Sequence, residues 1–196
     1  MKLLDIIYEQ QSPPQGKPTV GFKSDYTGKG GELEKTFPAP QKLKKPEKQI
    51  ANSYSENALE MIKKWEKFSN KNYLCPSKRK TIGYGTRLEY HPELKNRCIT
   101  EAKAVAVLKE DLNKYAVEAI KKFIKIPLAQ NQFDALCSLI YNIGRPKFAK
   151  SDLLNDLNAK NWESLKQNWS EFRIGDGQVL PGLVKRRSEE LRLFFA

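Results

Sequence analysis

Apolar residues recur at three- and four-residue steps along much of this chain, a spacing typical of amphipathic helices. The first such stretch follows Ser53 and Glu56, which have the spacing of a capping box. We predict that this helix runs to about Lys67. Its apolar positions are Leu59, Met61, Ile62, Trp65 and Phe68.

The same periodicity predicts five further helices toward the C-terminus. They are a long helix capped by Thr100 and ended by Pro127, an apolar helix containing Phe133 to Tyr141 and closed by Gly144, a short helix capped by Ser151, a helix over residues 162–172, and a last helix that begins at Pro181.

The segment from Lys71 to Tyr90 lacks helical periodicity. Pro76, Gly83 and Gly85 interrupt it, and residues 81–85 are typical of a strand followed by a turn. The sequence therefore predicts a predominantly helical α+β protein. A small β-containing lobe is joined by the long helix to an all-helical lobe.

The first 50 residues differ from the rest because they are rich in proline and glycine and show little periodicity. Such a composition is typical of a loop-rich extension rather than a packed unit. We therefore predict an N-terminal extension over residues 1–50 and one compact domain over residues 51–196.

The chain is basic, with 35 Lys and Arg against 23 Asp and Glu and a net charge of +12. A solvated basic surface explains most of such an excess, but a polyanionic partner such as nucleic acid, an anionic membrane or a bacterial cell wall also fits. The spread of basic residues along the whole chain disfavours nucleic acid. No apolar run approaches the roughly 20 residues of a membrane span. The opening residues, interrupted by Asp5 and Glu9, make a poor signal peptide.

Cysteine and histidine are sparse and widely spaced. Cys75, Cys98 and Cys137 do not form a disulfide framework, and His91 is the single histidine. No ligand-spaced pair supports a zinc site, and nothing further supports a Cys75–His91 thiol-protease pair. We expect neither a metal nor a cofactor, and Cys98 and Cys137 are most simply buried small apolar residues.

The most informative spacing is that of Glu66, Cys75 and Thr81: an acid, a thiol nine residues later and a hydroxyl six residues further on. Cleavage of a sugar–sugar bond needs a protonated acid and a positioned water on the opposite face. Glu66 is predicted at the end of an apolar helix, beside Trp65 and Phe68, and apolar neighbours favour a protonated carboxyl. Taken singly, the three residues also fit an exposed glutamate, a buried thiol and a strand threonine.

With these residues placed, the chain resembles the phage-type lysozymes, the endolysins of glycoside hydrolase family 24. The family motif is a Glu, eight residues, an Asp or Cys, five residues and a Thr, and this chain matches the Cys version. The resemblance runs from about Asn52 to the C-terminus. It is carried by residues 62–68, by residues 73–76 with 81–85, by residues 132–144, and by residues 181–187 with Glu189 or Glu190 behind them.

The resemblance implies a muramidase that hydrolyses the β-1,4 bond between N-acetylmuramic acid and N-acetylglucosamine in bacterial peptidoglycan and so lyses bacteria. Glu66 would be the general acid, while Cys75 and Thr81 would hold and polarise the attacking water. Because a thiol is a weak base at neutral pH, hydrogen bonding fits Cys75 as well as proton removal does. Direct attack by water inverts the anomeric configuration, which we expect, whereas attack by Cys75 or a carboxylate would retain it.

Five further residues are candidate substrate ligands. Gly83 and Gly85 would let the backbone approach the sugar, although a turn role is nearly as well supported. Tyr141 and Asn142 suit stacking on a pyranose and bonding an acetamido group, and Tyr141 also fits a core position. Arg186 could bind peptide-stem carboxylates, pair with acids near the site, or form a plain surface pair with Arg187.

The expected partner is bacterial peptidoglycan, bound by a monomer without nucleic acid or stable membrane insertion. The lack of an N-terminal apolar anchor favours accumulation in the host cytoplasm and holin-dependent release to the periplasm and cell wall. Two alternatives remain: an antibacterial effector with the same chemistry, delivered by a secretion system or phage tail, and a cell-wall-binding module that does not cut.

Overall fold

The computed structural model describes residues 50–75, 79–175 and 177–196, and all structural statements below concern these residues. The predicted extension over residues 1–50 lies almost wholly outside them, so it stays a prediction. The elements run in the order α1 Glu56–Glu66, β1 Ser69–Leu74, β2 Lys80–Gly83, β3 Thr86–Arg87, η1 Pro92–Leu94, α2 Glu101–Asp111, η2 Leu112–Val117, α3 Glu118–Phe123, α4 Gln130–Ile143, α5 Arg145–Ala149, α6 Asp152–Ala159, α7 Trp162–Ser170, β4 Ile174–Gly175, β5 Gln178–Val179 and α8 Pro181–Phe194.

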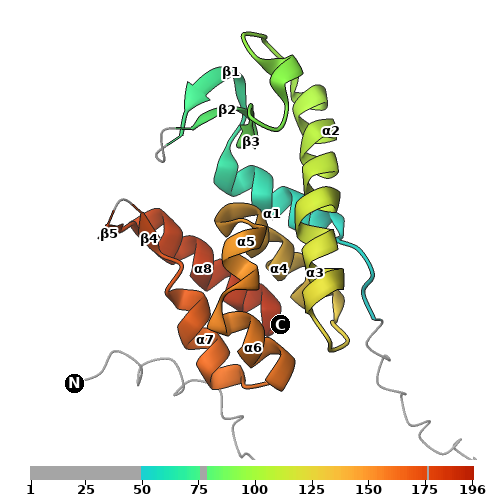
Figure 1. Ribbon diagram of the computed structural model, residues 1–196, viewed down its shortest axis with the longest axis vertical. Coiled ribbons are helices and arrows are strands. Elements are labelled where there is room, and N and C mark those ends of the chain that lie inside the picture. The colour runs from blue at the N-terminus through green and yellow to red at the C-terminus, as the bar shows by residue number, and fades with distance from the viewer. Residues whose placement is uncertain (1–49, 76–78, 176) are drawn as a thin grey trace, which may run out of the picture. The chain divides into compact units, whose positions relative to one another are not determined.

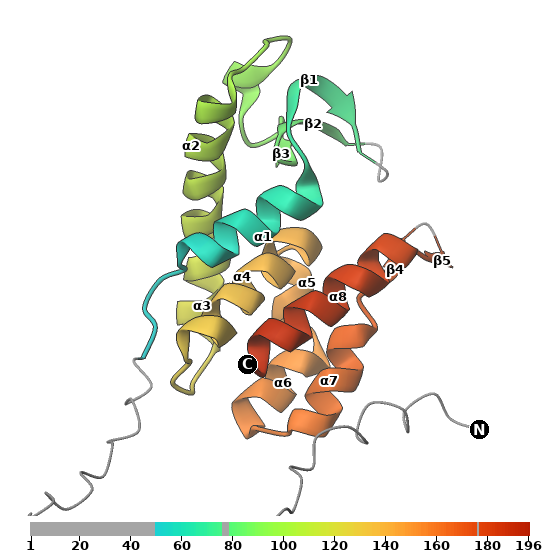
Figure 2. The same cartoon turned by 180° about the vertical axis from the view of Figure 1, so that it is seen from behind.

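The small lobe is an antiparallel sheet in the order β1-β2-β3, with Tyr73 opposite Thr81 and Thr81 opposite Arg87. Its own apolar cluster joins the sheet to α2 through Ile82 and Val107. The helical lobe lies on the opposite side of α1 from the sheet, and the α2–η2–α3 segment runs along both lobes (Figures 1 and 2). The predicted α+β arrangement of two lobes and a long connecting helix is confirmed.

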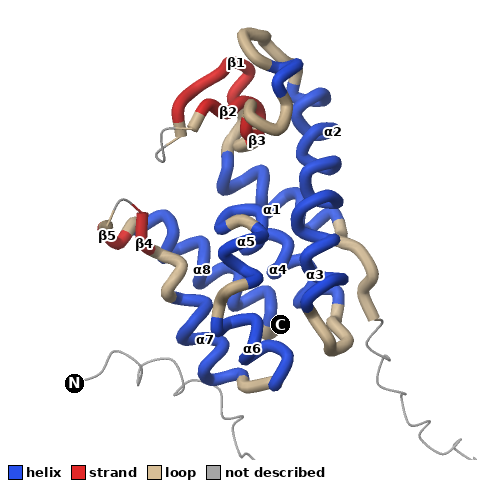
Figure 3. The backbone as a smooth tube through the Cα atoms, viewed as in Figure 1, coloured by secondary structure: helices blue, strands red, loops and turns tan. Residues whose placement is uncertain are grey.

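The long helix begins where the sequence predicts, because the Thr100 hydroxyl accepts a hydrogen bond from the Lys103 amide at 3.2 Å. It continues to Phe123, but its middle segment η2 is π-helical rather than α-helical. Outside the two small sheets, the regular structure of the described residues is helical (Figure 3).

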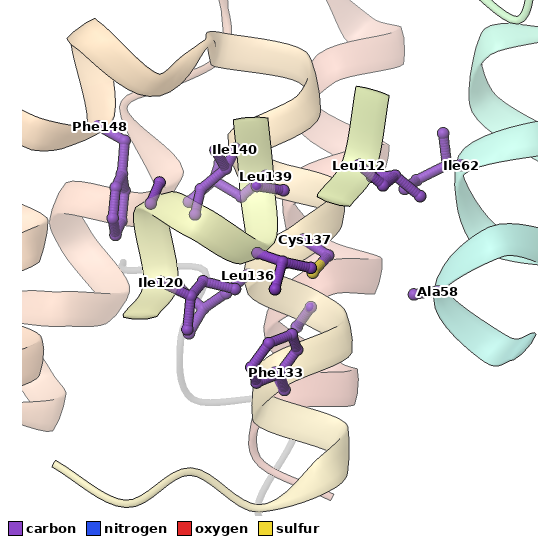
Figure 4. Packing of buried hydrophobic residues seen from close by; sticks show 14 of the residues in the cluster. Ala58, Ile62, Leu112, Ile120, Phe133, Leu136, Cys137, Leu139, Ile140 and Phe148 are labelled. Atoms are coloured by element: carbon purple, nitrogen blue, oxygen red, sulfur yellow. The ribbon is translucent and has the colours of Figure 1, made fainter. Parts of the chain in front are cut away.

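Helix α4 is the centre of the helical lobe. Its residues from Phe133 to Ile140 are all buried, which is expected of a helix surrounded by other helices. Leu136, Cys137 and Leu139 contribute to the large apolar cluster, together with Ile62 from α1 and Leu112 from η2 (Figure 4). Cys137 is therefore a buried apolar residue, as predicted, whereas Cys98 is exposed and that prediction is wrong.

Two predicted caps differ from the structure. Ser55, not Ser53, begins α1: its hydroxyl accepts from the Asn57 amide at 3.2 Å and donates to the buried Asp134 carboxylate of α4. Ser151 precedes α6, but its hydroxyl donates to the Phe148 carbonyl at 2.7 Å instead of capping that helix.

Candidate active site

Glu66 is the last residue of α1, and two distant elements contact its carboxyl. Arg186 of α8 donates from Nη1 to Glu66 Oε1 at 2.6 Å. Gly85, in the turn between β2 and β3, lies so close that a Cβ there would stand 2.9 Å from Glu66 Oε2. The Glu66 side chain is 19% exposed. The carboxyl is thus oriented at one oxygen, lies against the Gly85 backbone with the other, and still reaches solvent.

The surroundings of Glu66 differ from the apolar setting that the sequence predicts. Trp65 is half-buried, and Phe68 is 38% exposed with its ring centroid 5.7 Å from that of Tyr84. The group hydrogen-bonded to the carboxyl is a guanidinium. The sequence could not reveal this contact, because Arg186 lies 120 residues from Glu66.

Cys75 and Thr81 lie on the same β1–β2 hairpin. Thr81 pairs with Tyr73, and Cys75 follows Tyr73 by two residues, so strand alternation places the three side chains on one face. The Cys75 amide extends the pairing by donating to the Arg79 carbonyl at 3.0 Å. Cys75 is half-buried, and the buried Thr81 hydroxyl donates to the Tyr73 carbonyl at 3.3 Å.

The two glycines of this region have different neighbours. Both have positive φ, 65° at Gly83 and 80° at Gly85. A Cβ on Gly83 would lie 3.1 Å from Ala104 Cβ, so the close approach that requires Gly83 is between the sheet and α2. Only Gly85 approaches the predicted catalytic acid. The turn role weighed for both glycines fits this geometry, and backbone contact with a sugar stays a prediction.

Tyr141, near the end of α4, forms a hydrogen bond with the same turn. Its hydroxyl donates to the Tyr84 carbonyl at 2.8 Å, next to Gly85. Burial raises the pKa of the Tyr141 hydroxyl well above its ordinary value, and the nearby Glu66 charge adds to this effect, so the hydroxyl stays a neutral donor. Asn142 follows it and is half-buried. Contacts of Tyr141 and Asn142 with substrate stay predictions.

Arg186 is only 3% exposed, so the surface pair weighed from the sequence is wrong. Its guanidinium donates to Glu66, to the buried Glu190 at 3.1 Å and to the Ser138 carbonyl at 3.2 Å. This geometry favours pairing with acids near the site over direct contact with peptide-stem carboxylates. The sequence contains one signal for these contacts: Arg186 and Glu190 are four residues apart on one predicted helix, a spacing that brings opposite charges together.

Arg187 extends the network into the interior. It donates to Glu190 Oε1 from Nη2 at 2.9 Å, and its Nε lies 2.8 Å from Glu190 Oε2. Burial lowers the pKa of Arg187 to about 10, against the opposing effect of Glu190, so it stays charged at neutral pH. Two arginines and two glutamates therefore form a charge-balanced chain that ends at Glu66.

His91 is engaged by acids. Its Nε2 lies 2.8 Å from Asp111 of α2, and its Nδ1 lies 3.1 Å from Glu93. Both ring nitrogens are therefore occupied, which removes support for a Cys75–His91 catalytic pair. Within the described part of the chain, no cluster of three or more His, Cys, Asp or Glu residues is placed to bind a metal, and no helix is long and apolar enough to cross a membrane.

Comparison with known proteins matches residues 63–190 to the phage lysozyme family. The endolysin of Acyrthosiphon pisum secondary endosymbiont phage 1 is 39% identical over 144 residues, covering 71% of this chain and 96% of that protein. The endolysin of Salmonella phage P22 is 35% identical, covering 72% and 97%. The muramidase domain of SpmX from Asticaccaulis excentricus superposes with a TM-score of 0.65 at 33% identity, covering 74% and 98%. The motif, the two-lobed fold and these relatives together place the chain in the phage lysozyme family.

Proposed function

We propose that this phage lysozyme is a muramidase that hydrolyses the β-1,4 bond between N-acetylmuramic acid and N-acetylglucosamine, with Glu66 as the general acid. The observation that carries the proposal is the Glu66 carboxyl itself. Arg186 orients one oxygen, Gly85 abuts the other, and 19% of the side chain remains exposed. When it is protonated, an acid held in this way can deliver its proton to the leaving glycosidic oxygen and become the carboxylate that pairs with Arg186.

Cys75 and Thr81 would steer the attacking water. The Thr81 hydroxyl uses its hydrogen on the Tyr73 carbonyl, which leaves its oxygen lone pairs to accept a hydrogen bond from water. A water that donates in this way keeps a lone pair for the anomeric carbon. The Cys75 thiol, on the same face of the hairpin, is the second group that could orient it. Attack by this water inverts the configuration.

Replacing Glu66 tests its role as the general acid. Glu66→Gln retains the shape and the hydrogen bond to Arg186 but has no proton to deliver, so turnover should fall by at least about 100-fold. The measurement is the appearance of new reducing ends in purified peptidoglycan. Circular dichroism checks the fold, and co-sedimentation with the wall checks binding. Turnover like that of the wild type would remove Glu66 from the mechanism, and a wild type that binds without cutting would identify a binding module.

Variants of Cys75 separate orientation of water from other roles. Cys75→Asp should keep activity, because a carboxylate also holds water, whereas Cys75→Ala should lose most of it. Proton NMR of fresh product from the wild type and the Asp variant reports the anomer formed. A retained configuration would indicate a covalent step in place of direct attack. Full activity of Cys75→Ala would show that the thiol is dispensable.

We further propose that the monomer acts on the cell wall after holin-dependent release from the cytoplasm. The basic net charge of +12 suits a wall that carries anionic groups. Cells expressing the protein without a holin should stay intact until their inner membrane is permeabilised, as followed by culture turbidity. Spontaneous lysis in the absence of a holin would contradict this route.

A further inference from the structure

Glu190 is the most completely buried acid near the site. It lies on α8 with no solvent exposure. Four donors from three helices converge on its carboxylate: Ser138 Oγ at 2.7 Å, Trp169 Nε1 at 3.1 Å, Arg186 Nε at 3.1 Å and Arg187 Nη2 at 2.9 Å. Burial of a charge is costly, and this number of donors offsets the cost. Nothing in the mechanism above uses Glu190 directly.

The guanidinium of Arg186 connects this buried acid to the site. Because a guanidinium is planar and rigid, fixing two of its nitrogens also fixes the direction of the third. Glu190 holds Nε, and the Ser138 carbonyl holds Nη2 at 3.2 Å. The remaining nitrogen, Nη1, points at Glu66 Oε1. The position of the donor on the catalytic acid is therefore set from the interior.

The charges around Glu66 come from several elements. Helix α8 supplies Arg186 in direct contact and Arg187 with Glu190 behind it. Helix α4 supplies the neutral Tyr141 hydroxyl, and the turn between β2 and β3 supplies the backbone at Gly85. Loss of the Glu190 charge would leave two arginines opposed only by Glu66.

We propose that Glu190 is a positioning residue for hydrolysis, which fixes Arg186 and through it the orientation of the Glu66 carboxyl. The proposal rests on the proposed function, because it takes Glu66 to be the group that delivers the proton.

Glu190→Gln tests it, since this change removes the charge and nearly preserves the shape. Without the Glu190 charge, the Arg186 guanidinium loses the partner of its Nε, so the donor to Glu66 is no longer fixed in direction. On soluble peptidoglycan fragments, kcat should therefore fall about tenfold with little change in KM.

Glu189→Gln is the matched control. Glu189 is next to Glu190 in the chain, but its carboxylate is 30% exposed and pairs with the exposed Lys64, so the same chemical change there should leave kcat and KM as in the wild type. A folded Glu190→Gln protein with the kcat of the wild type would overturn the proposal.

If Glu190→Gln does not fold, the double variant Glu190→Gln/Arg187→Gln removes one charge of each sign. It should lose kcat at constant KM, as expected for Glu190→Gln alone, because Arg186 still lacks its anchor. Wild-type kcat in the folded double variant would overturn the proposal. Failure of the proposed function itself would appear differently, as wild-type turnover in Glu66→Gln.

Discussion

At the scale of single residues, the site depends on which atoms touch the Glu66 carboxyl. The Arg186 hydrogen bond at 2.6 Å selects one orientation of the acid, and a charge-assisted bond of this kind is stronger than one between neutral groups. The second oxygen faces the backbone of Gly85 at a distance that leaves no room for a side chain.

Gly85→Ala should therefore damage the site as well as the backbone. Its φ of 80° is strained for alanine, which costs about 1 kcal/mol of stability or more. The new Cβ would also displace the Glu66 carboxyl, so turnover of peptidoglycan should fall at least about tenfold.

Gly177→Ala provides the control for the strain alone. Gly177 has a similar φ of 77°, but among the described residues, its two chain neighbours aside, a Cβ there would meet no atom within 4 Å. This variant should lose comparable stability in urea unfolding and keep its activity. Equal activity losses in both variants would show that the contact with Glu66 is unimportant.

Glu66 and Thr81 could be predicted from the sequence because their signals are local: a helix end, a strand and a fixed spacing. The sequence also predicted apolar neighbours from Trp65 and Phe68, but not the guanidinium that bonds the carboxyl, because residues next to each other in the chain need not surround the same atoms. The Glu66 carboxyl points to α8, and only the packing of α1 and α8 around α4 reveals Arg186 as its partner.

At the scale of elements, α4 supports the turn that contacts the acid. The Tyr141 hydroxyl donates to the Tyr84 carbonyl at 2.8 Å, which ties the helical lobe to the loop between β2 and β3. The position of Gly85 against Glu66 thus depends on a hydrogen bond between two elements.

Two variants of Tyr141 separate this role from stacking on a sugar. Tyr141→Phe retains the ring but leaves the Tyr84 carbonyl unpaired, which should cost about 1 kcal/mol of stability and lower kcat several-fold. Tyr141→Leu removes both the ring and the hydroxyl. Kinetics on soluble fragments give the answer: if stacking is the main role, Tyr141→Phe will behave as the wild type and only Tyr141→Leu will show a raised KM.

Element ends were predicted where a single residue dominates, as at Thr100, Gly144 and Pro181. Ser55 replaced Ser53 as the α1 cap because Ser55 also bonds the buried Asp134, 79 residues away. Helix α5 was missed because Gly144 and Pro146 signal an end; here Pro146 lies in the first turn of a new helix, where its missing N–H is harmless.

At the scale of the whole molecule, the class and order of the lobes follow from local periodicity, but their docking does not. Docking depends on pairs such as Ser55 with Asp134 and Glu66 with Arg186, which are far apart in sequence. Another such contact is that of His91 with Asp111, between the segment after the sheet and the end of α2.

The His91 contact makes stability depend on pH. Burial lowers the pKa of His91, but hydrogen bonds and charges from Asp111 and Glu93 outweigh it, and the folded pKa is raised above 6.5. The folded state therefore binds this proton more tightly than the unfolded state does. The stabilisation is complete below pH 6.5 and is lost as the pH rises through the folded pKa of His91.

His91→Gln should accordingly cost about 2 kcal/mol at pH 6, the typical contribution of a hydrogen bond to a charged group, and less at pH 8. Urea unfolding at both pH values measures the difference. Lys109→Gln is the control for general charge effects. It removes an exposed positive charge from α2, the helix that carries Asp111, and should cost little stability at either pH. A His91→Gln cost that grows with pH would mean that the neutral ring is the stabilising form. The contact between the small lobe and the long helix would then be an ordinary neutral hydrogen bond, without the ion pair that the two flanking carboxylates indicate.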